Sequence, residues 1–358
     1  MTGQALQASD RPLVDQHDVA LLDLDGVVYV GADAVPEVPR IIGTAAEAGM
    51  RFGYVTNNAS RTPHEVGEHL RRLGIPALDN EVITSSQAAS RVLASRLPPG
   101  SSVLIVGTAA LAAEVENAGL RAVWAAAERP VGVVQGYHPE LSSSMLAEAC
   151  VAVRAGAFWV ATNADSTLPS PRGPLPGNGS FVQVVARTTG ATPVVAGKPE
   201  PAMHTECVLR TGARRPLVVG DRLDTDIEGA RRAHVPSLLV LTGVARAADL
   251  LAAPPGQRPT YLAADLGGIL APQPGIERSD GLAQCENWLV RERSGSLQLT
   301  WAGDGDGSDA VHASDQAAVD CAALRAIAVL AWDVGTTQTV AGDQAARGAL
   351  TRLELAAG

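Results

Sequence analysis

Short apolar runs alternate with longer amphipathic stretches along most of the chain, which is typical of a parallel α/β fold. A first series comprises strands at residues 20–24, 51–56, 194–196, 217–219 and 236–240 and helices at residues 35–48 and 63–73. Prolines stand near the start of both helices and a glycine follows each. The series tapers off near residue 270 and predicts a parallel sheet covered by helices.

A second α/β series interrupts the first between residues 85 and 190. Its strands are expected at residues 102–106, 122–124, 131–134 and 158–161, and a loop rich in Pro, Gly and Ser follows at residues 166–180. Beyond a linker at residues 271–275, we expect a hairpin at residues 288–293 and 297–301 and a helix at residues 315–332.

The predicted fold class is α/β with three parts. A Rossmann-like parallel-sheet core takes residues 15–85 and 191–270, and an inserted α/β cap domain takes residues 86–190. The linker and a small α+β C-terminal domain occupy residues 271–358.

Composition and charge argue against several classes of function. Hydrophobic residues make up 46% of the chain and charged residues 18%, which predicts packed cores. The net charge of −10 argues against a nucleic-acid partner, since the phosphate backbone requires a basic surface. Neither a signal peptide nor an apolar run long enough for a membrane span is apparent. We therefore expect a cytoplasmic protein, and a homo-oligomer stays open.

The first chemical signal is Asp23-Leu24-Asp25-Gly26 at the end of an apolar strand. Ligands in open α/β sheets bind at the carboxyl ends of strands, and Gly26 lets the chain turn away there. A second acidic motif, Gly220-Asp221-Arg222-Leu223-Asp224-Thr225-Asp226, follows another apolar strand. Oxygen ligands of this kind suit Mg²⁺. Each motif alone also fits a helix-capping pair or a solvated turn.

Two further motifs follow strands of the first series. Thr56-Asn57-Asn58 offers a hydroxyl and turn amides that can hold phosphate oxygens. Lys198, within Gly197-Lys198-Pro199, can neutralise the charge shared by a phosphate and carboxylates. An isolated lysine is usually a solvated surface group, but four motifs at strand ends in this order favour one phosphate-processing site.

Together, the motifs DLDGV, TNN, GKP and GDRLDTDI resemble the haloacid dehalogenase superfamily, in its branch with a large α/β cap. The resemblance covers residues 18–270. With the C-terminal segment, the chain resembles the actinobacterial D,L-glycerol-3-phosphate phosphatases, whose tail is similar to part of an acetyltransferase fold. The resemblance implies an Mg²⁺-dependent phosphatase of glycerol and phospholipid metabolism.

The resemblance also implies roles for individual residues. Asp23 is the expected nucleophile, which forms an aspartyl-phosphate, and Asp25 the general acid and base. The carboxylates of Asp23 and Asp221 and the backbone carbonyl of Asp25 would hold Mg²⁺, with Asp226 orienting a metal-bound water or Lys198. Residues expected to bind phosphate or substrate are Thr56, Asn57, Asn58, Lys198 and, in the cap, Asn163 and Asp165.

The cap loop is polar and has few aromatic or basic residues, so a small polyol phosphate, glycerol 3-phosphate, is the expected substrate. A phosphatase for phosphoglycolate, pyridoxal phosphate or a nucleoside monophosphate is the alternative within the enzymes. A non-enzymatic metabolite sensor is the alternative outside them, and the intact acidic and lysine motifs argue against it.

Overall fold

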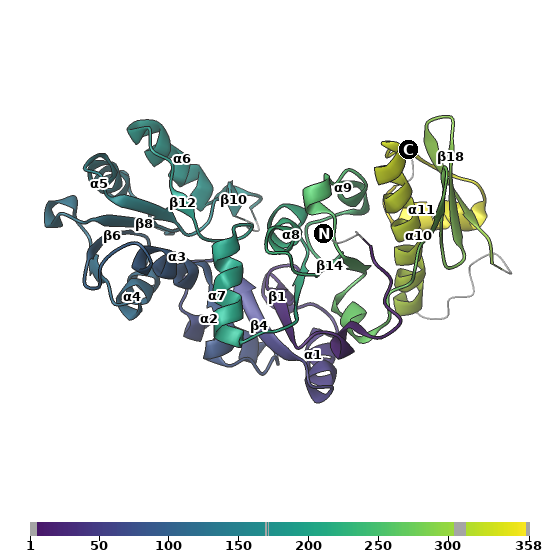
Figure 1. Ribbon diagram of the computed structural model, residues 1–358, viewed down its shortest axis with the longest axis horizontal. Helices are drawn as coiled ribbons and strands as arrows, with labels where there is room; N and C mark the ends of the chain where they lie inside the picture. Colours follow the sequence, from purple (N-terminus) through teal and green to yellow (C-terminus); the bar gives the residue numbers. More distant parts are fainter. Residues whose placement is uncertain (1–5, 169, 171, 304–312, 356–358) are drawn as a thin grey trace. The chain divides into compact units, whose positions relative to one another are not determined.

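The computed structural model describes residues 6–168, 170, 172–303 and 313–355. The chain divides into two compact units, Met1–Phe52 with Arg214–Gly358, and Gly53–Ala213 (Figure 1). The boundary falls inside strand β4 (Arg51–Thr56). The three-part division into core, cap and C-terminal domain stays a prediction.

Four parallel strands form the sheet of the first unit, in the order β15-β14-β13-β1. They are β1 (Val19–Asp23), β13 (Pro216–Gly220), β14 (Ser237–Val240) and β15 (Tyr261–Ala263). A hairpin, β2 (Tyr29–Val30) and β3 (Asp33–Ala34), follows β1, and the helices are α1 (Val38–Glu47), α8 (Glu228–Arg232) and α9 (Ala247–Leu251). The strands are buried along nearly their whole length, as expected of a parallel sheet.

The tail of the chain belongs to the first unit. Its mixed sheet runs β16-β17-β18-β19-β20, and its helices are α10 and α11 (Figure 1). The bounds are β16 (Glu277–Ser279), β17 (Leu282–Cys285), β18 (Trp288–Arg293), β19 (Ser296–Trp301), β20 (Thr339–Ala341), α10 (Ala313–Val334) and α11 (Gln344–Arg352). The predicted hairpin and helix are confirmed.

One hydrophobic core joins the tail to the sheet that carries the acidic motifs. It contains Leu223, Leu239 and Leu262 together with α10 residues such as Ile327. The fully buried Arg325 of α10 reinforces this junction, because its guanidinium donates to the carbonyls of Leu262, Gln7 and Pro274 at 3.3, 2.8 and 3.0 Å. The tail is therefore packed as part of the first unit.

The second unit contains a five-stranded parallel sheet and a further parallel pair of strands. The end of β4 pairs with β5 (Val82–Thr84), and a five-stranded sheet runs β12-β9-β8-β6-β7. Its strands are β6 (Ser102–Val106), β7 (Arg121–Val123), β8 (Gly132–Gln135), β9 (Phe158–Ala161) and β12 (Val194–Val195). The helices are α2 (Pro63–Arg72), α3 (Ser85–Ala94), α4 (Ala109–Asn117), α5 (Ser143–Arg154), α6 (Asn178–Thr189) and α7 (Pro201–Thr211).

Two predictions about this unit are wrong. Residues 194–196 were expected in the first series, but β12 pairs with β9 of the five-stranded sheet. The loop expected at residues 166–180 contains a short hairpin, β10 (Thr167–Leu168) with β11 (Leu175–Pro176), and helix α6 begins at Asn178. Residues 169 and 171 of that loop lie outside the described residues.

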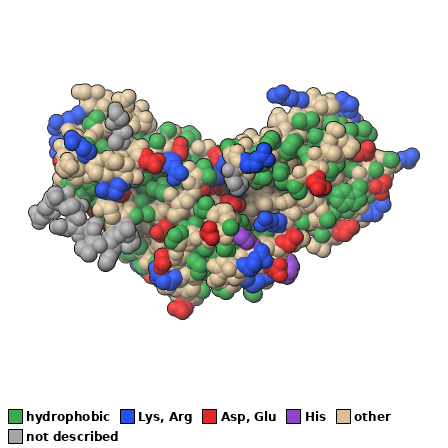
Figure 2. Space-filling model, turned by 180° about the vertical axis from the view of Figure 1, so that it is seen from behind, with side chains coloured by type: hydrophobic (Ala, Val, Ile, Leu, Met, Phe, Trp, Pro, Cys, Tyr) green, Lys and Arg blue, Asp and Glu red, His purple; other side chains and the backbone are tan. Residues whose placement is uncertain are grey.

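The charges on the surface and the lengths of the helices are relevant to the expectations about nucleic acid and membranes. On the face drawn in Figure 2, described Lys and Arg side chains are interspersed with Asp and Glu. Within the described part of the chain, no helix has the length and apolar character needed to cross a membrane.

Candidate active site

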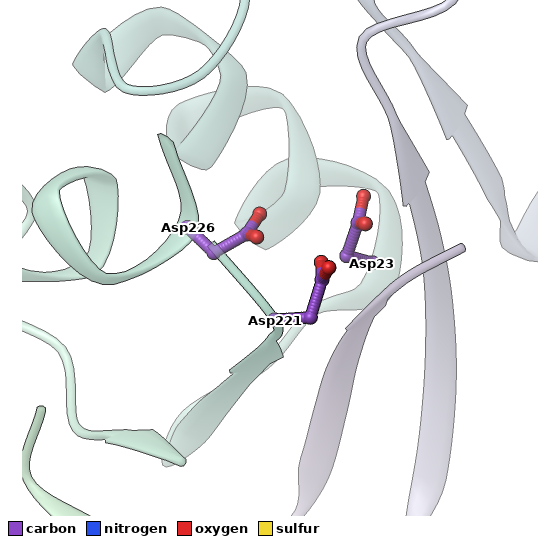
Figure 3. Close-up of side chains that lie close together, drawn as sticks. All are labelled: Asp23, Asp221 and Asp226. Atoms are coloured by element: carbon purple, nitrogen blue, oxygen red, sulfur yellow. The ribbon is translucent and has the colours of Figure 1, made fainter. Parts of the chain in front are cut away.

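Three carboxylates converge in the first unit. Asp23 is the last residue of β1 and Asp221 follows β13, and these neighbouring parallel strands end at the same edge of the sheet. One carboxylate oxygen from each of Asp23, Asp221 and Asp226 lies within 4.8 Å of the others (Figure 3). Asp221 and Asp226 are buried. Burial of acidic groups this close is costly unless a cation accompanies them.

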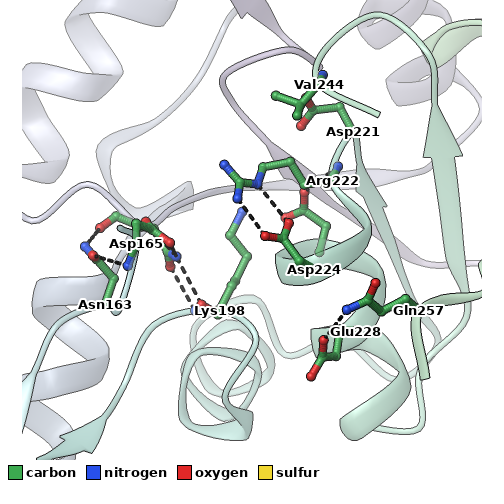
Figure 4. A network of polar contacts seen from close by, with 11 residues as sticks. Asn163, Asp165, Lys198, Asp221, Arg222, Asp224, Glu228, Val244 and Gln257 are labelled. Carbon is green, nitrogen blue, oxygen red and sulfur yellow. Dashed lines mark hydrogen bonds and ion pairs between the residues drawn. The ribbon is translucent and has the colours of Figure 1, made fainter. Parts of the chain in front are cut away.

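The Asp221 carboxylate sits against the backbone of two glycines. A Cβ atom at Gly243 would lie 1.9 Å from Oδ2 of Asp221, and one at Gly26 would lie 2.4 Å from it. The same oxygen accepts a hydrogen bond of 2.6 Å from the Val244 amide (Figure 4). Thr242 Oγ1 donates to the Gly26 carbonyl at 2.5 Å and holds the two turns together. Only glycine fits at positions 26 and 243.

Sequence analysis missed the turn at residues 242–244. Its donor to Asp221 is a backbone amide, which no residue type marks, so the only signal was a glycine soon after the apolar strand at residues 236–240. The structure shows that it supplies a backbone donor to Asp221.

Asp226 lies on a single π-helical turn, Leu223–Ile227. Its Oδ2 accepts a hydrogen bond of 3.2 Å from the Arg222 amide, and its Cβ would be 2.2 Å from a Cβ at Gly220. Asp224 instead is exposed and pairs with the Arg222 guanidinium at 2.8 Å (Figure 4). Within the acidic motif, Asp221 and Asp226 therefore lie close to Asp23, whereas Asp224 does not belong to this group.

These three side chains fit a divalent metal ion. They supply hard oxygen donors and concentrated negative charge, which Mg²⁺ and Ca²⁺ both prefer. The side chain of Asp25 is exposed and is not in the group. Sequence analysis assigned only the backbone carbonyl of Asp25 to the metal. Asp25 opens a tight turn in which the Gly26 amide donates to the Tyr29 carbonyl at 2.8 Å.

The Thr56-Asn57-Asn58 turn of the second unit follows strand β4. Thr56 is buried, and its Oγ1 accepts a hydrogen bond of 3.0 Å from the Asn58 amide. Oδ1 of Asn58 accepts bonds of 2.8 and 2.7 Å from the amide and hydroxyl of Ser60. The side chains of Thr56 and Asn58 thus shape the turn itself.

Asn57 links this turn to the Gly197-Lys198-Pro199 turn. Its Oδ1 accepts a bond of 2.8 Å from the Lys198 amide, and its Nδ2 donates to the Lys198 carbonyl at 3.1 Å. Any side chain at Gly197 would collide, because a Cβ there would lie 2.6 Å from Asn57 Oδ1 and 2.5 Å from the Thr162 carbonyl. The backbone of Lys198 is therefore held from both sides by one asparagine.

The two expected cap residues join the same cluster. Nδ2 of Asn57 also donates to both carboxylate oxygens of Asp165, at 3.2 and 3.4 Å. Asn163 Nδ2 donates to the Asn57 carbonyl at 2.7 Å, and its Oδ1 accepts from the Asp165 amide at 3.2 Å (Figure 4). The structure thus brings Asn57, Asn163, Asp165 and the Lys198 backbone together, while their expected contacts with substrate stay a prediction.

Ser85 is a further member that sequence analysis missed. It opens helix α3, and its hydroxyl donates to the Asn57 carbonyl at 2.6 Å. The available signal was Thr84-Ser85-Ser86-Gln87, a capping-box pattern directly after a strand.

His204, in the helix that follows the lysine turn, is mostly buried, and burial lowers its pKa to about 4. The imidazole is therefore neutral at physiological pH.

Family models match both acidic segments of the chain. The haloacid dehalogenase-like hydrolase model matches residues 20–121, and a second model of the same hydrolases matches residues 195–269. The D-glycerol 3-phosphate phosphatase of Mycobacterium tuberculosis is 43% identical over 96% of both chains. The acid sugar phosphatase of Staphylococcus aureus is 36% identical over 72% of this chain and 98% of its own.

Solved structures agree with the sequence comparison. The glycerol phosphate phosphatase of Mycobacterium tuberculosis in complex with magnesium matches with a TM-score of 0.85 and 43% identity, over 97% of this chain and 99% of that chain. Its complex with calcium matches with a TM-score of 0.83 and 42% identity, over 97% of this chain and all of that chain.

Proposed function

Because the chain belongs to the haloacid dehalogenase-like hydrolases and is a phosphatase that needs a divalent metal ion, we propose that it hydrolyses glycerol 3-phosphate with Mg²⁺ as cofactor. The observation that carries the proposal is the convergence of Asp23, Asp221 and Asp226 at the ends of two parallel strands. Parallel α/β sheets bind their ligands at this edge.

Asp23 is the proposed nucleophile. Its carboxylate attacks phosphorus, the ester oxygen leaves, and an aspartyl-phosphate forms. Asp25 gives its proton to the leaving oxygen and then takes one from the water that hydrolyses the intermediate. Because Asp25 is exposed at a turn, whereas Asp221 and Asp226 are buried, it is accessible for this exchange.

The carboxylates of Asp23 and Asp221 and the backbone carbonyl of Asp25 would hold Mg²⁺. When bound, the ion neutralises the charges of the carboxylates and the phosphate, which otherwise repel each other. Asp226 would orient Lys198 or a water molecule bound to the ion. The Val244 amide fixes Asp221 through its hydrogen bond.

Thr56, Asn57, Asn58 and Lys198 are proposed to bind the phosphoryl group. The side chains of Asn57 and Asn58 are engaged within the protein, so their contribution lies in shaping the two turns. Lys198 supplies the positive charge.

Glycerol 3-phosphate is the proposed substrate on two grounds. The Mycobacterium tuberculosis relative that acts on it shares nearly the full length of this chain, and Asn163 and Asp165 offer polar groups suited to a short polyol. We place the enzyme in the cytoplasm, in recycling of glycerophospholipid head groups or of glycerol phosphate, with core, cap and tail as its three domains. The second candidate is another small phosphate monoester, since the sugar phosphatase relative covers the same core.

Release of inorganic phosphate from a panel of monoesters tests the proposal. Glycerol 3-phosphate should have the highest kcat/KM in Mg²⁺ and no turnover in chelator. Asp165→Ala should raise KM for glycerol 3-phosphate more than for 4-nitrophenyl phosphate. A tenfold preference for phosphoglycolate or pyridoxal phosphate would reject the substrate, and full activity in chelator would reject the mechanism.

A further inference from the structure

The first turn of helix α6 docks onto the segment that carries Asn163 and Asp165. The amides of Gly177 and Gly179 donate to the carbonyls of Ser166 and Asp165, both at 2.9 Å. A Cβ at Gly177 would lie 2.3 Å from the Asp165 carbonyl oxygen, and one at Gly179 would lie 2.2 Å from the Ala164 carbonyl oxygen. Glycines on both sides of Asn178 therefore permit an approach that no other residue allows.

Asn178 uses this approach to reach two backbone carbonyls. It is buried, and its Nδ2 donates to the carbonyls of Asn163 at 2.9 Å and Gln135 at 3.3 Å. Its Oδ1 is buried and has no hydrogen-bond partner among the described residues. The two donated bonds therefore set the orientation of the amide and tie α6 to the ends of strands β8 and β9.

A continuous chain of hydrogen bonds leads from Asn178 to the lysine turn. Asn178 holds the Asn163 carbonyl, Asn163 Nδ2 holds the Asn57 carbonyl at 2.7 Å, and Asn57 holds the amide and the carbonyl of Lys198. Three asparagine amides thus connect the start of α6 to the backbone of Lys198. Each link lies within the second unit.

We propose that Asn178 is a positioning residue of the phosphoryl-binding turn. It contacts neither substrate nor metal and acts on Lys198 through Asn163 and Asn57. This inference rests on the proposed function in one respect, namely that Lys198 binds the phosphoryl group. Loss of Asn178 therefore weakens every phosphate monoester through Lys198, and it weakens glycerol 3-phosphate additionally through Asn163.

Asn178→Asp tests the proposal with a nearly isosteric change. It replaces the donor with an acceptor that faces two carbonyl oxygens, and the side chain makes no other hydrogen bond among the described residues. Asn178→Ser is the milder second variant, and Asn80→Asp, at an exposed position of the same unit, is the matched control. The measurements are the thermal midpoint, kcat and KM for glycerol 3-phosphate and 4-nitrophenyl phosphate, and calorimetric affinity for inorganic phosphate with Mg²⁺ present.

The expected result is a loss of about tenfold to a hundredfold in kcat/KM for 4-nitrophenyl phosphate and a loss at least as large for glycerol 3-phosphate, with a parallel loss of phosphate affinity. Lower pH should partly restore N178D, because the introduced carboxyl group can donate once it is protonated. Unchanged phosphate affinity in a folded variant, or an effect confined to one leaving group, would overturn the proposal. Unfolding of both variants would overturn it too, since Asn178 would then serve general stability. Failure of the wild-type enzyme on both esters would instead reject the proposed function.

Discussion

Replacing Gly243 with alanine is expected to weaken metal binding without removing any metal-binding group. The new methyl group would stand 1.9 Å from Oδ2 of Asp221 and 2.5 Å from its Cγ, so the carboxylate or the 242–244 backbone must move. Either movement breaks the 2.6 Å bond from the Val244 amide. A hydrogen bond to a charged group is worth about 1.5–3 kcal/mol, which corresponds to roughly tenfold to a hundredfold in Mg²⁺ affinity.

Calorimetric Mg²⁺ titration and the Mg²⁺ dependence of phosphate release measure the effect of Gly243→Ala. Gly256→Ala is the matched control in the same unit, because a Cβ at Gly256 meets nothing within 4 Å. The variant should also lose about 1–3 kcal/mol of unfolding free energy through overpacking. Wild-type Mg²⁺ affinity in a folded Gly243→Ala protein would refute the assignment of Asp221 to the metal site.

Four other outcomes are expected. Asp23→Asn should lower kcat by at least about a thousandfold, and retention of a tenth of the wild-type rate would exclude the covalent route. Ca²⁺ should fail to replace Mg²⁺ in steady-state assays and should inhibit, since it accepts more ligands and misaligns Asp23; equal rates with both ions would contradict this. Burial lowers the pKa of His204 to about 4, so the unfolded chain binds the proton more tightly than the folded chain does. The free energy of unfolding should therefore be highest above about pH 6.5 and should fall as the pH drops toward 4. The urea midpoints of His204→Asn should depend less on pH than those of the wild type. Gly43→Ala, in α1 with open space around it, should raise the unfolding free energy by about 0.5–1 kcal/mol, as a denaturant titration would show.

The positions of the strands were predicted more accurately than the start of helix α1 and the pairing of β12. Strand β6 and strand β9 lie where their apolar runs placed them, because each run is short and bounded by turn residues. Helix α1 begins at Val38, later than predicted, because Glu37 adopts a left-handed conformation with φ of 65°. The position of β12 could not follow from its order in the chain, since pairing with β9 depends on contacts that sequence order does not encode.

The candidate site was predictable where side chains carry the chemistry. Asp23 and Asp221 were expected at one sheet edge, and the structure brings them together. The amide of Val244 and the hydroxyl of Ser85 were not predicted, because a backbone donor has no pattern of its own and the capping box at Ser85 indicates a helix start but not a bond to Asn57. Asn57 was expected to face phosphate, but geometry alone reveals that its amide binds the lysine turn.

The bonds of Arg325 impose an order on biosynthesis. The second unit is one uninterrupted segment, residues 53–213, so all its contacts are available once that segment has left the ribosome. The first unit contains both ends of the chain, and Arg325 binds the carbonyls of Gln7 and Leu262, which are more than three hundred residues and more than sixty residues away, respectively. Strand β1 therefore gains its partner β13 only after the second unit has been synthesised, and the segment around Gln7 gains its bond from Arg325 only once α10 has been synthesised. The acidic site combines Asp23 with Asp221 and Asp226, so it can assemble only after the segment that carries Lys198 has been synthesised.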